Sequence, residues 1–340
     1  PAVLSLPENS LLFSSLAGDD RGCLFRAVKS GRLPADRLDQ VFRDLKAARR
    51  AGNPRPPGEI LGFPADRGKP PEALLGIRIG PWLLERALGR GVSGPAFLAR
   101  DEAGVPVVVK LLTLAEGETG TGGTAAESTV TEGPGALAAR SRALVKANLR
   151  WQLPLREVRE VEGRVALVHD YLPAGSLAGR LPGGPGQPLP WIDACAWMLG
   201  AARALAELEP LGWFHGAISA ENLFEDEQGN LRLHETALAP VKTALDNVYY
   251  CAPELVRDGK QDLSGDIFSL GALGYRLLCG NYPFDGDTPG EVLYRRLGGH
   301  PPPLRGQGVE VPEELSALVS WMMAPSALHR PTIGDVVGRL

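Results

Sequence analysis

The sequence has few cysteines, few histidines and no long apolar run, and each shortage excludes a class of protein. No stretch reaches the roughly 18 apolar residues that a membrane-spanning helix needs, so we expect no membrane span. The four cysteines lie far apart without a Cys-x-x-Cys pair, and we expect buried free thiols rather than a disulfide framework. The five histidines show no metal-ligand spacing, which argues against a structural metal.

The charge balance is slightly acidic, and lysine is scarce. The formal net charge is −4, and seven of the 36 basic residues are lysines. This balance argues against a nucleic-acid partner. The N-terminus has no basic segment before its apolar stretch, so we expect no signal peptide and a cytoplasmic location. Because the chain begins with Pro1 rather than Met, we also expect it to be a processed or excised piece.

The first 76 residues differ in pattern from the rest. After Pro34, one apolar stripe recurs at helical spacing, formed by Leu38, Val41, Phe42 and Leu45. A passage rich in Pro and Gly follows it. We therefore expect residues 1–76 to form a helical N-terminal appendix and a linker.

Beyond this appendix the pattern changes twice. Residues 77–172 contain short β-branched segments separated by glycine turns, which predict an antiparallel sheet. Residues 115–136 interrupt them with almost no large apolar side chain, and we expect a flexible insertion there. Residues 173–340 are dominated by amphipathic helical segments. The pattern predicts an α+β fold with a sheet-rich lobe followed by a helix-rich lobe.

The segment GRGVSG places Gly89, Gly91 and Gly94 between two predicted strands. Such a turn lets backbone N–H groups approach a phosphate chain without interference from Cβ atoms. A glycine turn without any ligand is the alternative. A strand rather than a helix follows the motif, which excludes the dinucleotide-binding fold.

Lys110 lies at the end of the predicted strand that begins with the valines before it. An apolar strand can hold one ammonium group beside phosphates inside a cleft. A lysine in solvent at a strand end is the alternative. Because this chain fills nearly every basic position with arginine, we favour the phosphate-binding interpretation.

Several segments together resemble the eukaryotic-type protein kinase family, including its bacterial serine/threonine kinases. They occur in the family's order and spacing over roughly residues 78–340: the glycine loop, the strand lysine, HGAISAENLF, RLHETALA, YYCAPE, DIFSLG and RPT. The resemblance implies a bilobal protein-kinase-like fold. It also implies that Glu254 pairs with Arg330 and that Asp266 holds the backbone of the catalytic loop.

The catalytic loop departs from the family's pattern of His-Arg-Asp-Leu-Lys-Pro-x-Asn. The resemblance implies that Ala217 occupies the position of the catalytic base and Ser219 that of the loop lysine. A methyl group accepts no proton. No catalytic residue is therefore assigned.

The metal-binding positions are partly retained. Asn222 matches the family's second metal ligand, although an asparagine here could instead cap the loop by bonding its backbone. Glu235 occupies the position of the metal-binding aspartate and carries its carboxylate one methylene further out. Thr236 and Ala237 replace the family's Phe and Gly. We assign Asn222 and Glu235 as weak metal-ligand candidates.

Active kinases pair the strand lysine with a glutamate on the following helix. Alignment places Arg140 or Ser141 where that glutamate belongs. Glu127 or Glu132 could substitute from within or beside the insertion. At this position the chain departs from the family's pattern.

The segment VALVHDYLPAGSL resembles the adenine-binding hinge. Asp170 and Leu172 would offer backbone groups to the base, and His169 occupies the gatekeeper position, where we expect a packed core residue. Val108 and Phe224 replace smaller residues above and below the adenine. The added bulk could narrow the pocket or fill it.

The leading hypothesis is a pseudokinase, a kinase-like scaffold that binds protein partners without efficient phosphoryl transfer. Residual ATP binding is an open part of this hypothesis, as is a requirement for Mg²⁺ or Mn²⁺. An active kinase or another signalling protein is the kind of partner that we expect. The alternative is an atypical serine/threonine kinase that uses Lys110, Asn222 and Glu235, and transfer of an adenylate group is a third possibility.

Overall fold

The structure is a computed structural model that describes residues 71–91, 94–112, 134–161, 164–181, 187–236, 248–259, 261–286 and 289–340. The predicted appendix, apart from its last six residues, and most of the predicted insertion lie outside these ranges. The contacts separate Phe284–Arg295 from the unit formed by Pro70–Pro283 and Arg296–Leu340. The unit formed by Pro70–Pro283 and Arg296–Leu340 contains the β-sheet.

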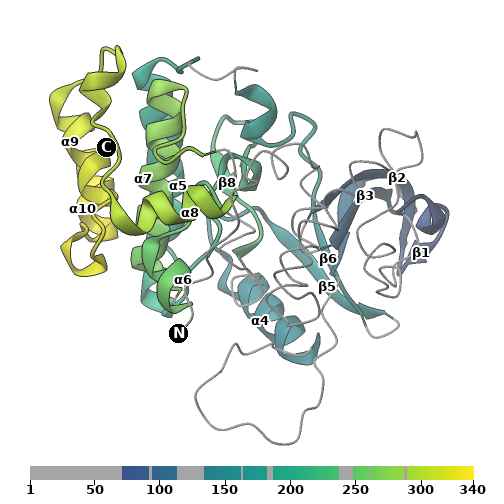
Figure 1. Ribbon diagram of the computed structural model, residues 1–340. Coiled ribbons are helices and arrows are strands. Elements are labelled where there is room, and N and C mark those ends of the chain that lie inside the picture. Colours follow the sequence, from purple (N-terminus) through teal and green to yellow (C-terminus); the bar gives the residue numbers. More distant parts are fainter. Residues whose placement is uncertain are drawn as a thin grey trace, which may run out of the picture. The chain divides into compact units, whose positions relative to one another are not determined.

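The N-terminal part of this unit is an antiparallel sheet, as the sequence predicts (Figure 1). Its six strands are ordered β1-β2-β3-β4-β6-β5. They span Arg78–Ile79 (β1), Trp82–Gly91 (β2), Gly94–Arg100 (β3), Pro106–Leu111 (β4), Leu155–Val161 (β5) and Arg164–Asp170 (β6).

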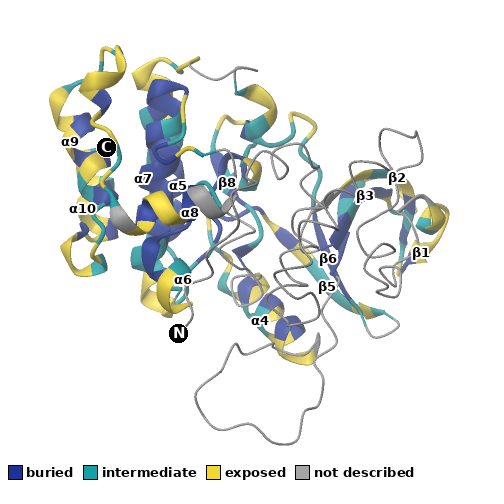
Figure 2. Ribbon diagram, in the orientation of Figure 1, coloured by how far each residue is buried: buried dark blue, intermediate teal, exposed yellow. Residues whose placement is uncertain are grey.

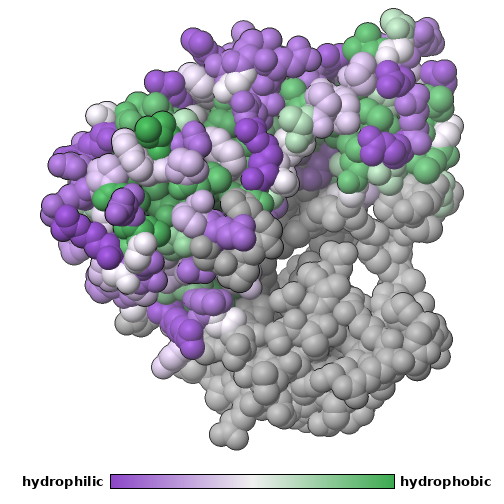
Figure 3. Space-filling view, turned by 90° about the horizontal axis from the view of Figure 1, so that it is seen from above, coloured by the Kyte–Doolittle hydropathy of each residue, from purple (hydrophilic) through white to green (hydrophobic). Residues whose placement is uncertain are grey.

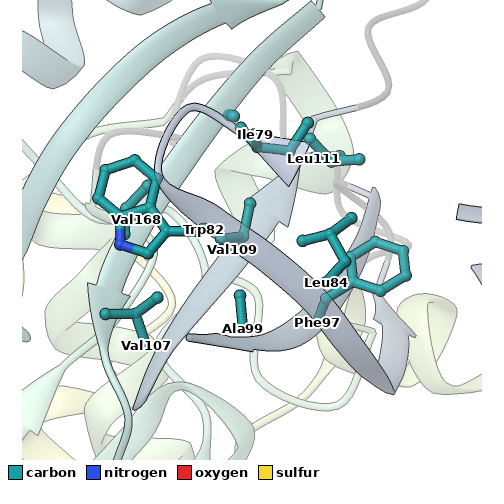
Figure 4. Close-up of a cluster of buried hydrophobic side chains, with 10 residues drawn as sticks. Ile79, Trp82, Leu84, Phe97, Ala99, Val107, Val109, Leu111 and Val168 are labelled. Carbon is teal, nitrogen blue, oxygen red and sulfur yellow. The ribbon is translucent and has the colours of Figure 1, made fainter. Parts of the chain in front are cut away.

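Buried side chains on one face of the sheet form an apolar core (Figure 4). Val107 and Val109 on β4 have no exposed surface, and they belong to one apolar cluster with Phe97 of β3 and Trp82 of β2. Since successive side chains of a strand point to opposite faces, this packing directs Lys110 to the other face. The valine run therefore positions the lysine.

Helix α4 (Pro134–Ala147) contacts β5 and β6. A second apolar cluster joins the helix to the sheet, consisting of Leu112, Leu137, Ala138, Leu144, Leu155, Val165 and Leu167. The helix begins at Pro134, so the last three residues of the predicted insertion, 134–136, belong to it. This boundary of the prediction was wrong, because proline is well tolerated in the first turn of a helix.

The C-terminal part of the unit is helical, which confirms the predicted bilobal α+β class. The main helices are α5 (Trp191–Ala206), α7 (Leu263–Cys279), α9 (Glu313–Met322) and α10 (Ile333–Arg339). Helix α8 (Pro289–Gly298) crosses the boundary of the unit at Arg295. The short helix α6 (Pro253–Asp258) was not predicted. Helix α7 is buried along most of its length and contacts α5 and α9 (Figure 2).

Two glycines allow this close helix packing. A Cβ atom at Gly271 would lie 2.9 Å from side-chain atoms of Met322 and Met323. One at Gly274 would lie 2.6 Å from the Met198 side chain. At Gly271 the close atoms include the Cβ of Met322, so this position requires glycine for contact. At Gly274 they belong to the end of the Met198 side chain, which would have to shift to admit a methyl group.

A short hairpin, β7 (Leu223–Glu225) and β8 (Leu231–Leu233), lies next to the sheet lobe. The backbone N–H of Leu153 donates to the carbonyl of Leu233 at 2.8 Å. The backbone N–H of Leu233 in turn donates to the carbonyl of Trp151 at 2.9 Å. These bonds connect the segment before β5 to β8. The two lobes are therefore joined by backbone pairing directly beside the segment that follows β8.

The described surface is mixed in character. On the face shown in Figure 3, hydrophobic residues lie among hydrophilic ones. Within the part of the chain that the structure describes, no helix is both long and apolar enough to cross a bilayer.

Candidate functional site

The three glycines of the predicted phosphate loop lie where β2 passes into β3. Gly91 is the last residue of β2 and pairs with Gly94, the first residue of β3. Gly89 has a φ of +152° and Gly94 a φ of +133°, conformations that a residue with a side chain rarely adopts. A Cβ atom at Gly89 would meet nothing within 4 Å. Backbone shape, rather than crowding, accounts for glycine at this position.

Lys110 is buried, with 5% of its surface exposed, so the alternative of a lysine in solvent is wrong. It pairs with Ala96 on β3 and with Leu167 on β6. Its ammonium group forms an ion pair with the carboxylate of Glu235. These two residues are 125 positions apart in the chain, and the structure brings them together.

Glu235 lies two residues after β8 and has a φ of +70°. For a residue with a side chain, this left-handed conformation costs about 1–2 kcal/mol. The adjacent Thr236 donates its hydroxyl to the side-chain oxygen of Gln152, whose amide donates to the Ala204 carbonyl at 2.9 Å. The tertiary structure therefore holds the backbone around Glu235 from the α5 side.

Sequence reasoning missed Gln152. Its side chain is 3% exposed and joins the segment before β5 to α5 and to Thr236. One polar residue within the apolar stretch WQLPL was a weak signal of a buried hydrogen-bonding role.

Helix α4 supplies no acidic partner to Lys110, because it contains neither aspartate nor glutamate. Ser141 is fully buried and donates its hydroxyl to the Leu137 carbonyl at 2.8 Å. The Arg140 guanidinium lies over the ring of Trp213. The predicted substitutes, Glu127 and Glu132, lie outside the described residues.

The catalytic-loop segment is fixed by Asp266 of α7. Its carboxylate accepts hydrogen bonds from the backbone N–H groups of His215 at 2.5 Å and Gly216 at 2.7 Å. The ring of His215 hydrogen-bonds the carbonyl of His234 at 2.6 Å. This is the backbone support that the family resemblance implies.

Ala217 and Ser219 lie in this supported loop, and both are buried. The Asn222 amide donates to the Ala217 carbonyl at 2.9 Å, so Asn222 caps the loop. The cap uses the amide nitrogen and leaves Oδ1 as the atom that could take a cation.

The donors do not fit a divalent metal ion in this arrangement. Mg²⁺ prefers carboxylate oxygens, and the carboxylate of Glu235 already contacts the ammonium of Lys110. Within the described ranges, no three His, Cys, Asp or Glu residues are grouped closely enough to hold a metal.

His169 is buried, as predicted for a packed residue. Its ring contacts that of His234 edge-on with centroids 4.7 Å apart, and Phe224 contacts His234 in the same way at 5.5 Å. Burial, with help from the charge of Lys110, lowers the pKa of His169 to about 3, and the Pro154 carbonyl opposes the shift. The ring is neutral at physiological pH.

The predicted hinge residues follow His169 directly. Asp170 ends β6 and forms an ion pair with Arg156, and both Asp170 and Leu172 are half-buried. Val108 pairs with His169 across β4 and β6. Val108 and His169 therefore lie on the same sheet face as Lys110.

A buried ion pair supports the helical lobe. Arg330 donates to both carboxylate oxygens of Glu254, at 2.6 and 2.8 Å, and to the Ser264 carbonyl at 2.9 Å. The guanidinium also lies over the ring of Phe268. This pair connects α6, the start of α7 and the segment before α10, as the resemblance implies.

Comparison with known proteins agrees with this geometry. The chain is 29% identical over 172 residues to the DNA damage-responsive serine/threonine-protein kinase RqkA of Deinococcus radiodurans, which covers 48% of this chain and 25% of the relative. It is 28% identical over 200 residues to the serine/threonine-protein kinase PknL of Mycobacterium tuberculosis, covering 56% and 49%. It is 31% identical over 223 residues to CBL-interacting protein kinase 4 of Oryza sativa subsp. japonica, covering 61% and 46%.

The matched region thus amounts to between a quarter and a half of the length of these relatives. The family model for the protein kinase domain matches residues 82–339, which include the glycine turn, Lys110, the supported loop and the Glu254–Arg330 pair. The chain belongs to the protein kinase family.

Proposed function

We propose that the chain is a pseudokinase, a kinase-like scaffold that binds protein partners and does not transfer phosphoryl groups efficiently. Ala217 carries this proposal. It lies in a loop that Asp266 holds firmly, at the position where a kinase needs a proton acceptor. Loss of a positioned general base costs about 10²–10⁴ in rate.

The cation and metal positions support the same conclusion. Ser219 stands where the family places a lysine that would steady the transferring phosphoryl group. Glu235 neutralises Lys110 instead of presenting a free carboxylate. Domains of this family generally use ATP with a divalent metal ion. Here we propose residual ATP binding through the glycine turn, Lys110 and the backbone of Asp170 and Leu172.

The residues that support the helical lobe match the family's pattern better than the catalytic positions do. The Glu254–Arg330 pair and the contacts of Asp266 maintain the helical lobe that other proteins could recognise. We therefore propose a cytoplasmic protein partner, such as an active kinase or another signalling protein.

The alternative function is an atypical serine/threonine kinase. It is favoured by the names of the relatives and by the buried position of Lys110 next to Glu235. Such an enzyme would have to use Lys110, Asn222 and Glu235 with a proton acceptor other than residue 217.

A phosphotransfer assay separates the two functions. The purified chain and Lys110→Met are incubated with γ-labelled ATP, Mg²⁺ or Mn²⁺ and protein substrates. The pseudokinase proposal expects equal background transfer from both proteins. Transfer well above background that Lys110→Met abolishes would establish an active kinase and overturn the proposal.

A further inference from the structure

In the ion pair of Lys110 and Glu235, the lysine is buried and the glutamate is largely covered. The exposed fraction is 6% for the lysine side chain and 13% for the glutamate side chain. Removing the partner of a buried ammonium group strongly destabilises the folded protein. Glu235 therefore partners a positive charge that the fold has buried.

The position of the carboxylate is built into the backbone. Glu235 has a φ of +70°, and the Thr236–Gln152–Ala204 hydrogen bonds hold the next residue against α5. Because α4 carries no acidic residue, the lysine charge is met from the segment after β8. The carboxylate thus lies where an anionic ligand of Lys110 would have to bind.

We propose that Glu235 is an internal competitor for the anion site at Lys110, so that the polyphosphate of a nucleotide binds only by displacing the Glu235 carboxylate from the ammonium group. The inference rests on the nucleotide binding in the proposed function and names how that binding is controlled. The Glu235 carboxylate and the phosphates compete for one buried cation. A displaced carboxylate stays close to the phosphates and repels them. Neutralising Glu235 therefore removes both the competition and this repulsion.

This role differs from that of a metal ligand in a measurable way. A competitor weakens nucleotide binding even when no metal is present. A metal ligand strengthens binding, and only when the metal is present. Glu235→Gln keeps the length of the side chain and an oxygen that can accept from Lys110, so it separates the two roles.

The test measures ATP and tripolyphosphate binding by titration calorimetry in EDTA and again with Mg²⁺. We expect Glu235→Gln to bind both ligands about tenfold or more tightly than the unaltered chain in EDTA. Glu160→Gln is the matched control, because this glutamate is 49% exposed on β5 and pairs with Arg142. It should leave the affinity unchanged. Lys110→Met should abolish the gain when combined with Glu235→Gln.

Unchanged or weaker binding by Glu235→Gln in EDTA would overturn the inference, as would a loss of affinity seen only with Mg²⁺. Absence of binding in every protein at millimolar ligand would also overturn it while leaving the pseudokinase scaffold intact. Conversely, γ-phosphate transfer by the unaltered chain overturns the proposed function alone.

A second variant covers the case in which Glu235→Gln does not fold. Thr236→Val keeps all charges and removes the hydroxyl that bonds Gln152. It should loosen the Glu235 backbone and tighten binding severalfold in EDTA. No gain in this variant would overturn the inference.

Discussion

The Thr236 hydroxyl donates a hydrogen bond of 2.5 Å to the side-chain oxygen of Gln152, and only 2% and 3% of these residues are exposed. The family resemblance leads one to expect a phenylalanine packed between apolar side chains at position 236. This chain has a polar contact there, and Gln152 extends it to the Ala204 carbonyl of α5. The lobes are therefore joined at this point by directional bonds rather than by apolar packing.

Gln152→Leu should lower the free energy of unfolding by about 1–3 kcal/mol, because the buried Thr236 hydroxyl then lacks an acceptor. Thr236→Val should cost a similar amount. The double variant should lose less than the two single losses combined, since each buried polar group then disappears with its partner. Urea unfolding of the four proteins measures the coupling, and simple additivity would contradict the proposed link.

Arg330→Met should destabilise the helical lobe by about 3–5 kcal/mol. It leaves the Glu254 carboxylate buried and uncompensated, and it also removes the guanidinium from the ring of Phe268. Thermal unfolding followed by circular dichroism measures the loss. Arg257→Met is the control, because its side chain is 60% exposed and pairs at the surface. A similar loss in both variants would contradict a special role for the buried pair.

Acid should destabilise the chain through His169. Its pKa is about 3 when folded, against an ordinary value of 6.5, so the unfolded chain takes up the proton first. The associated stability is fully present above pH 6.5 and is lost as the pH falls towards 3, at about 1.4 kcal/mol per pH unit. Besides Lys110, the His234 ring faces this group.

The measurement compares urea unfolding of the unaltered chain and His169→Leu between pH 7 and pH 4.5. The variant should lose stability less steeply with falling pH than the unaltered chain. Parallel curves would show that His169 is not the group that resists protonation.

Gly271→Ala should destabilise the packing of α7 against α9 by about 1–3 kcal/mol, because the new methyl group would lie 2.9 Å from the Cβ atom of Met322. Gly338→Ala in α10 is the matched control, since its Cβ would meet nothing within 4 Å. The control should be neutral or stabilising by up to about 1 kcal/mol. Equal melting temperatures for the two variants would contradict the close helix approach.

The predictable features were those set by local pattern. The valines around Lys110 alternate as strand residues do, and their burial follows from that alternation. The amphipathic segments of residues 173–340 likewise predicted the helical lobe. Helix α6 was missed because its six residues are too few for an apolar period to show.

The sequence by itself determined the family, the antiparallel sheet and the helical lobe, and it predicts Ala217 at the base position. Each depends on residue identity and short-range order. Only the tertiary structure decided that Lys110 contacts Glu235 and that Gln152 holds Thr236. These contacts join segments at least 84 residues apart. They depend on strand register and on a left-handed backbone at Glu235, which packing imposes against local preference.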